Sequence, residues 1–356
     1  MAMMANHWGR NNNDVTVITL QPRSTDFYQL HSRVKRVSLD LAHVSPNLLS
    51  AVFNNWRRVR RLHKEIQRST PDVVISFMDT TNVLTLLATV GSSFPVIVSE
   101  RIDPRQHRIN WIWAGLRRWL YRRAQAVVVQ SESMRSWAGA ISHKNAVWVI
   151  PNPLNGTPCD AQGKSDRSHS ALPDGRLIVA MGRLVPQKGF DLLMQAFAQC
   201  VHKVHDWSLV ILGDGEESGR LKMLAADLGI AAHVSLAGKV DQPLAILKKA
   251  HLFTLSSRYE GFPNALLEAM ACGLPVISFD CESGPREIIR DGIDGVLVPP
   301  GNVSALAAAM ERLMLDDEER RRLSLRAAEV TERFGLERIM GIWNVHLNQL
   351  TGRIRQ

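Results

Sequence analysis

The sequence predicts an α/β protein with two doubly wound, Rossmann-like domains. Its 356 residues exceed what one hydrophobic core usually accommodates. Short β-rich runs alternate with longer helical patterns, which is typical of parallel sheets with crossover helices. A stretch rich in turn-forming residues, from 151 to 175, interrupts this alternation near the middle of the chain. We therefore expect a first domain at 1–155, a linker at 156–175 and a second domain at 176–335.

The β-rich runs define the expected strands of each domain. In the first domain they lie at 15–20, 73–77, 95–100, 126–131 and 146–150. In the second domain they lie at 177–182, 208–213, 233–238, 251–256, 275–279 and 295–299, and each except the last precedes a helical pattern. A final helix is expected at 336–356, because apolar residues recur at helical spacing, namely Ile339, Ile342, Trp343, Leu347 and Leu350. Its apolar stripe must pack on another surface.

Composition indicates a globular chain with 45% apolar and 22% charged residues. No run of about 18 apolar residues exists to span a bilayer, and the start lacks the pattern of a signal peptide. We therefore expect a cytoplasmic protein. The four cysteines have no metal-ligand spacing and are expected to be reduced and mostly buried: Cys159, Cys200, Cys272 and Cys281.

Positive charge is concentrated in the first half of the chain. Residues 1–150 have a net charge of +11, and residues 151–356 have a net charge of −2. The helical pattern at 49–68 separates basic residues from an apolar stripe that we expect to face inward, formed by Leu49, Val52, Phe53, Trp56, Val59, Leu62 and Ile66.

A second basic pattern, at 105–123, predicts an inward stripe and a basic outward face. The inward stripe consists of Ile109, Ile112, Trp113, Leu116 and Leu120. Outside it, Trp111 is grouped with Arg108, Arg118 and Arg122. Both basic patterns fit either ordinary solvated helix faces or contact with an anionic membrane surface. We do not expect nucleic acid as a partner, because no recognised nucleic-acid motif accompanies the charge.

The segment 256–275 carries the most specific signal for function. It places Glu260 and Glu268 eight positions apart across an expected loop-to-helix junction. Pro263 bars a helix from running through it, and the Asn264 side chain is expected to cap a helix that begins near Ala265. The free N–H groups of 264–267 favour an anion. A carboxylate on each side suits a ligand with a diphosphate in the middle and hydroxyls at both ends, as in a nucleoside diphosphate sugar.

This segment resembles the E-x7-E signature of the retaining glycosyltransferases of family 4. Further motifs of the family follow its order: GRLVPQKG at 182–189, GDG at 213–215, GPREII at 284–289 and DG at 291–292. The resemblance covers residues 176 to about 300. SER-x-DP at 99–104 and CESGPREII at 281–289 are similar to the subgroup that builds exopolysaccharide and O-antigen units, which includes amylovoran galactosyltransferases.

The resemblance implies a GT-B architecture. Two Rossmann-like domains face a cleft, the first binds the acceptor and the second binds the sugar nucleotide. The final helix crosses back to the first domain. Family members begin with a strand and a Gly-rich loop before a helix that resembles the start of this chain, so we expect a missing first strand and connection of roughly ten to fifteen residues.

The resemblance also assigns roles to residues. Glu260 binds the transferred sugar, Glu268 binds the ribose, and Arg183 and Lys188 bind the diphosphate; the catalytic residues are Glu260, Arg183 and Lys188. Other expected donor-binding residues are Gly182, Gly213, Gly215, Gly261, Phe262, Pro263, Asn264, Ala265 and Leu267. Glu287 either contacts the donor or stabilises a helix start.

The acceptor side is less defined by the motifs. Many relatives carry a histidine after the strand equivalent to 95–99, whereas this chain has Glu100 and Arg101, and we expect His107 to be a surface residue. Glu100, Arg101 and Asp103 are therefore candidate acceptor-side residues. No convincing DxD motif is present, so we expect no metal and no cofactor.

The expected function is retaining transfer of a hexose from a nucleoside diphosphate sugar, and the expected donor is a UDP-sugar. The acceptor is a glycan or a polyprenyl-diphosphate-linked glycan in cell-surface polysaccharide assembly, and the enzyme lies peripherally on the inner face of the cell membrane. Two alternatives stay open: a catalytically impaired sugar-nucleotide-binding protein and a GT-B-fold sugar-nucleotide epimerase.

Overall fold

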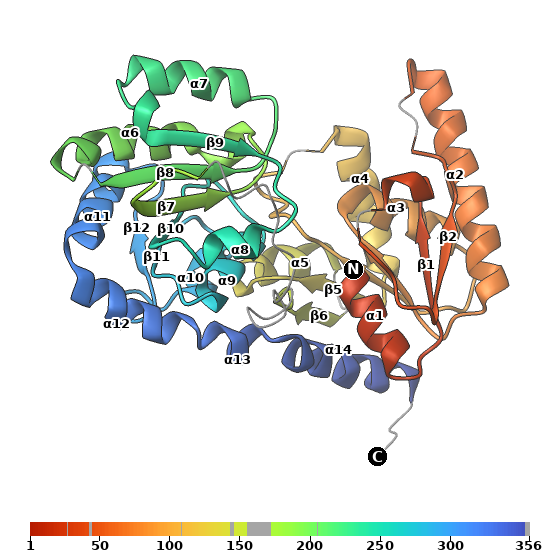
Figure 1. Cartoon of the computed structure of the whole chain (residues 1–356). Helices are drawn as coiled ribbons and strands as arrows, with labels where there is room; N and C mark the ends of the chain where they lie inside the picture. Colours follow the sequence, from red (N-terminus) through yellow and green to blue (C-terminus); the bar gives the residue numbers. More distant parts are fainter. Residues whose placement is uncertain are drawn as a thin grey trace. The chain divides into compact units, whose positions relative to one another are not determined.

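The computed structural model describes residues 1–26, 28–42, 45–107, 109–142, 146–154, 172–204 and 206–352. It divides the chain into two compact units (Figure 1). The first unit consists of Met1–Pro151 together with Ile339–Gln356, and the second consists of Asn152–Arg338. Most of the expected linker lies outside the described residues.

The first unit contains two parallel sheets with helices between the strands. One sheet has two strands, β1 (Val15–Thr19) and β2 (Val34–Ser38). The other has four strands in the order β3-β4-β5-β6, at Val74–Phe77, Val96–Ser99, Ala126–Val129 and Ala146–Val149. The helices are α1 (Ala2–Arg10), α2 (Leu48–Ser69), α3 (Asp79–Ala88), α4 (Trp111–Leu120) and α5 (Arg135–Ser142).

Strand β2 was not expected from the sequence. Its segment, VKRVS, places Lys35 and Arg36 next to each other, which obscures the alternation of a strand. The five expected strands of this unit are all present. β4 and β5 are fully buried, as expected for inner strands of a parallel sheet covered on both faces.

The two sheets of the first unit are not joined by hydrogen bonds among the described strands. β1 pairs with β2, β3 pairs with β4, and the described residues contribute no strand between β1 and β3. The additional innermost strand expected from the sequence stays a prediction.

Two helices of the first unit differ from the expected orientation. In α2, Leu62 and Ile66 are buried as expected, whereas the residues of its first two turns expose their large apolar side chains. In α4, Trp113 and Leu116 pack inward, but Ile112 is exposed rather than inward. Trp111, Arg118 and Arg122 face outward as expected, and Arg108 lies outside the described residues.

The second unit has one six-stranded parallel sheet in the order β12-β11-β10-β7-β8-β9. The strands in chain order are β7 (Arg176–Met181), β8 (Trp207–Leu212), β9 (Val234–Gly238), β10 (Leu252–Leu255), β11 (Val276–Phe279) and β12 (Val296–Val298). The helices are α6 (Phe190–Cys200), α7 (Ser218–Asp227), α8 (Pro243–Leu247), α9 (Asn264–Ala271), α10 (Pro285–Ile288), α11 (Val303–Leu315), α12 (Asp317–Ala327) and α13 (Val330–Phe334).

Helix α11 corrects the expectation that no helix follows the last strand. The Asn302 side chain caps it by accepting a hydrogen bond from the N–H of Ala305 at 2.9 Å. Leu306, Met310 and Leu313 are fully buried in the core beneath the sheet. An N-cap followed by apolar residues at this spacing is a helix signal that the sequence did contain.

The last helix, α14 (Leu336–Thr351), confirms that the C-terminal segment returns to the first unit. Trp343 is buried and meets Trp8 edge to face, with ring centroids 6.2 Å apart. The Trp8 indole N–H donates to the Asn344 side chain at 2.9 Å. His346 stacks on Trp148 with ring centroids 4.4 Å apart. Of the apolar stripe that the sequence predicted, Ile339 and Trp343 are buried, and Ile342, Leu347 and Leu350 are half-buried.

No described helix is long and apolar enough to cross a membrane. Cys200 and Cys281 are buried free thiols, and Cys272 is a half-buried free thiol, in agreement with the sequence; Cys159 lies outside the described residues.

Candidate functional site

The first group of site residues follows β7 in the second unit. Arg183 lies just beyond the carboxyl end of this strand, where open α/β sheets bind ligands. Its side chain is exposed and forms no hydrogen bond or ion pair with the rest of the described chain. Lys188 closes a short 3-10 helix, Pro186–Lys188, a few residues later. One free cation and one positioned cation therefore lie in the same loop.

Two loops are held together by close backbone contact. Gly189 has φ of +61°, and a Cβ there would lie 2.1 Å from the carbonyl oxygen of Ser256. Only glycine permits this approach without strain. Because Ser256 begins the segment that carries Glu260, the contact fixes Lys188 relative to that carboxylate.

Lys188 and Glu260, which are 72 positions apart in sequence, form a partly buried ion pair. Lys188 Nζ lies 2.5 Å from Glu260 Oε1, and the Ser257 hydroxyl donates to the same oxygen at 2.6 Å. The lysine stem runs beside Gly182, where a Cβ would lie 3.2 Å from it. Two predicted catalytic residues are therefore brought into direct contact, and Gly182 leaves room for one of them.

The start of α9 differs from the predicted cap. The helix begins at Asn264, one residue earlier than expected, with Pro263 as its N-cap and no side-chain cap. The Asn264 side chain instead accepts a hydrogen bond from the Asn152 amide at 2.9 Å. The N–H groups of Leu266 and Leu267 donate to the Pro263 carbonyl oxygen. Fewer N–H groups are therefore free to bind an anion than expected: those of Asn264 and Ala265, rather than all four of residues 264–267.

Glu268 lies one turn inside α9 and is half-buried. Its carboxyl group forms no hydrogen bond or ion pair with any described residue. Burial raises its pKa to about 7. An unpartnered carboxyl in this position is typical of a group that accepts hydrogen bonds from a ligand.

Glycines allow the neighbouring loops to approach this site. Gly213 has φ of +139°, and a Cβ there would lie 1.9 Å from the Gly182 carbonyl oxygen. A Cβ on Gly215 would lie 2.4 Å from the Leu184 carbonyl oxygen. The loop after β8 is therefore packed directly against the loop that carries Arg183.

The segment between Glu260 and α9 is tied to the loop before α10. Phe262 is buried and packs against Phe334, with ring centroids 5.5 Å apart. The Ser283 hydroxyl donates to the Gly261 carbonyl oxygen at 3.1 Å. Glu287 lies half-buried in the first turn of α10, and both interpretations of its role stay open.

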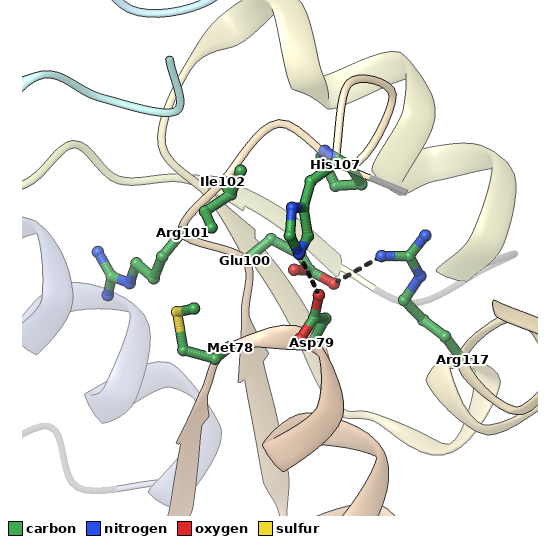
Figure 2. A pocket seen from close by; sticks show the side chains of 8 residues that line it. Met78, Asp79, Glu100, Arg101, Ile102, His107 and Arg117 are labelled. Carbon is green, nitrogen blue, oxygen red and sulfur yellow. Dashed lines mark ion pairs between the residues drawn. The ribbon is translucent and has the colours of Figure 1, made fainter. Parts of the chain in front are cut away.

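The first unit contains a separate pocket at the carboxyl ends of β3 and β4 (Figure 2). Its space of about 210 Å³ includes open solvent. Tyr121, which is fully buried and does not line the pocket, donates its hydroxyl hydrogen to the lining residue Glu100 at 2.5 Å, and Arg117 lies 3.7 Å from the same carboxylate. Burial raises the pKa of Glu100 to about 7, against the opposing effects of Tyr121 and Arg117.

His107 lies in this pocket and faces Asp79, with 3.5 Å between Nε2 and Oδ2 (Figure 2). His107 is therefore half-buried and paired rather than a plain surface residue. Asp79 begins α3, and Met78, which lies between β3 and Asp79, has a positive φ of 75°. A non-glycine residue in this conformation is strained, and such strain is common beside functional sites.

The other two acceptor-side candidates have distinct environments. Burial lowers the pKa of Arg101 to about 10. Its guanidinium lies over the Phe77 ring, 4.6 Å from the ring centroid. Asp103 is fully buried and accepts hydrogen bonds from the Arg105 side chain and backbone N–H. The Asp103 carboxylate therefore holds its own turn together.

The sequence analysis missed Asp79 and Arg117 as pocket residues. They come from two different helices, α3 and α4, and no spacing in the sequence connects them. The one available signal was Asp79, a polar residue two positions after a predicted strand.

Comparisons with known proteins identify the family and the fold of the chain. A model described as "Glycosyl transferase 4-like domain" matches residues 1–153, and one described as "Glycosyl transferases group 1" matches residues 162–330. A crystal structure of Anabaena Alr3699/HepE in complex with UDP and glucose is similar in fold, with a TM-score of 0.78 and 20% identity over 98% of this chain and 94% of that one.

Three relatives are similar in sequence. An exopolysaccharide phosphotransferase of Streptomyces coelicolor is 33% identical over 81% of this chain, which spans only 30% of that protein's length. A Campylobacter jejuni alpha-1,4-N-acetyl-D-galactosaminyltransferase, named for an undecaprenol-diphosphate-linked substrate, is 28% identical over 89% of this chain and 85% of its own length. The amylovoran biosynthesis glycosyltransferase AmsD of Erwinia amylovora is 30% identical over 64% of this chain and 63% of its own length.

Together the two family models match residues 1–153 and 162–330, which cover most of both units. The chain belongs to the glycosyltransferases of family 4 and has their GT-B fold.

Proposed function

We propose that this protein is a retaining glycosyltransferase that moves a hexose from a nucleoside diphosphate sugar to a glycan or polyprenyl-diphosphate-linked glycan during cell-surface polysaccharide assembly. UDP is the proposed donor nucleotide. The observation that carries the proposal is the arrangement at α9. The loops before this helix contribute the partly buried Lys188–Glu260 pair and Arg183, and the helix itself contributes Glu268. Arg183 and the Glu268 carboxyl have no hydrogen-bond or ion-pair partner among the described residues.

The relatives support the substrate classes. The Campylobacter relative is named for transfer to a lipid-diphosphate-linked glycan, and the Erwinia relative is named for amylovoran biosynthesis. The Anabaena structure of the same fold holds UDP and glucose. We propose the same classes of donor and acceptor for this chain.

In the proposed reaction, the bond between the sugar C1 and the diphosphate oxygen breaks. A new bond forms between C1 and the acceptor hydroxyl oxygen on the same face of the ring, and the hydroxyl proton passes to the leaving diphosphate. The protein then supplies no nucleophile. It positions both substrates and stabilises the negative charge that develops on the diphosphate.

Each charged residue has a part in this step. Arg183, which has no partner among the described residues, binds the diphosphate together with the free N–H groups at the start of α9, and the proposal includes no metal. Lys188 is already positioned by Glu260 and shares its charge between that carboxylate and the diphosphate. Glu260 retains the Ser257 hydrogen bond and orients hydroxyls of the sugar. Glu268 accepts hydrogen bonds from the ribose.

The pocket of the first unit is the proposed acceptor side. In the proposal, the carboxylates of Glu100 and Asp79 accept hydrogen bonds from sugar hydroxyls, and the His107 ring donates to them. The net positive charge of the first half, together with the exposed face of Trp111, Arg118 and Arg122, supports reversible attachment to an anionic membrane at the inner face of the cell membrane.

The experiment compares Glu260→Gln and Arg183→Ala with the parent in sugar transfer from a panel of nucleotide sugars to a lipid-diphosphate sugar. Loss of one such charge-assisted contact raises the barrier by about 2–4 kcal/mol, so transfer should fall by about 30- to 1000-fold while melting stays unchanged. Glu216→Gln and Arg321→Ala, at exposed positions of the same unit, serve as matched controls.

Near-parental transfer by either site variant would remove the proposed site. Donor conversion that needs no acceptor would favour the epimerase, and donor binding without any turnover would favour a catalytically impaired binding protein.

A further inference from the structure

The first two turns of α2 place four large apolar side chains in solvent. Leu49, Val52, Phe53 and Trp56 are 85%, 70%, 56% and 51% exposed. They lie at i, i+3, i+4 and i+7, so they form one continuous stripe on the outward side of the helix. Phe53 and Trp56 also stack on each other, with ring centroids 5.9 Å apart. We call these four residues the α2 stripe.

Polar contacts on the opposite side of the helix fix this orientation. The Asn54 amide donates to the Ser45 hydroxyl at 2.9 Å. Arg58 donates through Nε to the Leu41 carbonyl oxygen at 2.8 Å and through Nη1 to the Asn55 side chain at 2.8 Å. Turning the helix to bury the α2 stripe would break the bonds to Ser45 and Leu41, which lie outside the helix. The helix start is also capped, since the Asn47 side chain and Ser50 form a reciprocal capping box.

Basic residues continue the outward face beyond the stripe. Arg57 lies over the Phe53 ring at 6.0 Å, and Arg60 lies over the Trp56 ring at 5.0 Å. The helix has six Lys or Arg residues and one acidic residue, Glu65, which pairs with Arg68. The outward face therefore has an apolar aromatic end and a strongly positive end.

This combination fits an anionic lipid bilayer better than a protein surface. Trp and Phe side chains favour the boundary between headgroups and acyl chains, while Arg and Lys favour lipid phosphates. α2 lies alongside the β1–β2 sheet and leaves the stripe uncovered by the described residues of its unit (Figure 1). The charge of the helix selects an anionic partner, and its flat row of apolar side chains suits a fluid apolar layer.

We propose that α2 is a membrane-insertion helix. The α2 stripe enters the outer acyl region of an anionic bilayer, and the Arg57 and Arg60 guanidinium groups move from the aromatic rings to lipid phosphates. The surface differs from the basic face of α4, and it specifies how the membrane contact of the proposed function is made. Binding is measured without any turnover, so its failure is distinguishable from failure of the proposed reaction.

The test is co-sedimentation of the whole chain with vesicles of phosphatidylcholine alone and with about one third phosphatidylglycerol. The parent should sediment with the anionic vesicles. The apolar variant Val52→Ser, Phe53→Ser, Trp56→Ser should partition at least about tenfold less at every salt concentration, since several buried apolar groups are lost. The charge variant Arg57→Glu, Arg60→Glu should lose binding mainly at low salt.

The matched control is Met223→Ser with Leu325→Ser, which removes two apolar side chains that are 64% and 78% exposed on the second unit. This variant should sediment like the parent. Circular dichroism checks that all variants remain folded, and UDP binding checks the second unit.

Two results would overturn the proposal: a parent that ignores anionic vesicles, or an apolar variant that sediments as well as the parent. Light scattering tests the alternative that a second copy of the chain covers the α2 stripe. A parent that dimerises, with an apolar variant that is monomeric yet binds vesicles normally, would assign the α2 stripe to a second copy of the chain.

Discussion

Replacing Glu268 by glutamine should make the free protein more stable and its nucleotide binding weaker. Glu268 is half-buried, and its carboxyl forms no hydrogen bond or ion pair with any described residue. Burial alone raises its pKa from 4.5 to about 7. The ionised group is therefore disfavoured in the folded state, and glutamine has nearly the same shape without the charge.

The magnitude follows from the pKa. Each unit of difference corresponds to about 1.4 kcal/mol, so the ionised carboxyl destabilises the fold by at most about 3 kcal/mol. Water that reaches the side chain lowers this ceiling, and we expect a gain of about 1–3 kcal/mol for Glu268→Gln. For a unit of this size, that gain corresponds to a melting temperature roughly 3–10 °C higher.

The raised pKa also fixes the direction in which the free energy of unfolding changes with pH. Because the folded pKa of Glu268 is raised, the parent loses stability as pH rises from about 4.5 to about 7, whereas the variant has no group to ionise there. The stability difference between variant and parent should be near zero at about pH 4.5 and largest above about pH 7.

The assay is thermal unfolding across this pH range, together with calorimetric titration of UDP. Loss of the charged acceptor should weaken UDP binding by about 10- to 100-fold. Glu216→Gln, at an exposed position of the same unit, should change neither quantity. The reasoning fails if Glu268→Gln is no more stable than the parent, or if it binds UDP as tightly as the parent.

Two further predictions concern the basic face of α4 and a close loop contact. Replacing Trp111 by Ser and both Arg118 and Arg122 by Glu should weaken sedimentation with anionic vesicles while UDP binding is unchanged; equal sedimentation would show that this face is merely solvated. Gly189→Ala should destabilise the second unit by more than about 2 kcal/mol in urea unfolding, because its Cβ meets a carbonyl oxygen at 2.1 Å. Gly292→Ala has similar φ but open space and should lose only about 1 kcal/mol; equal losses would mean that the loop contact is unimportant.

The order of strands and helices was largely readable from the sequence. All eleven expected strands are present, because inner strands of parallel sheets are continuous apolar runs and the crossover helices have a different period. β2 was missed because Lys35 and Arg36 interrupt its alternation. The family was also readable, because its motifs lie in loops whose glycines and charges stand at fixed spacing.

The contacts of the candidate site were not readable to the same extent. The motif named Lys188 and Glu260 separately, but their pairing depends on Gly189 allowing two loop backbones to touch. Asn264 has the right residue type for a helix cap, yet its side chain bonds to Asn152, which is 112 positions away. A local rule cannot anticipate a partner that the fold brings from elsewhere.

The α2 helix shows the same division most clearly. The sequence by itself determined that residues 49–68 form a helix with an apolar stripe, because periodicity depends only on the order of residues along the chain. It did not determine which side of the first two turns faces the core. That was decided by the tertiary contacts of Asn54 and Arg58 with the preceding loop, together with the burial of Leu62 and Ile66. A stripe has the same period whether it faces protein or solvent, so only the neighbours that the fold supplies decide its direction.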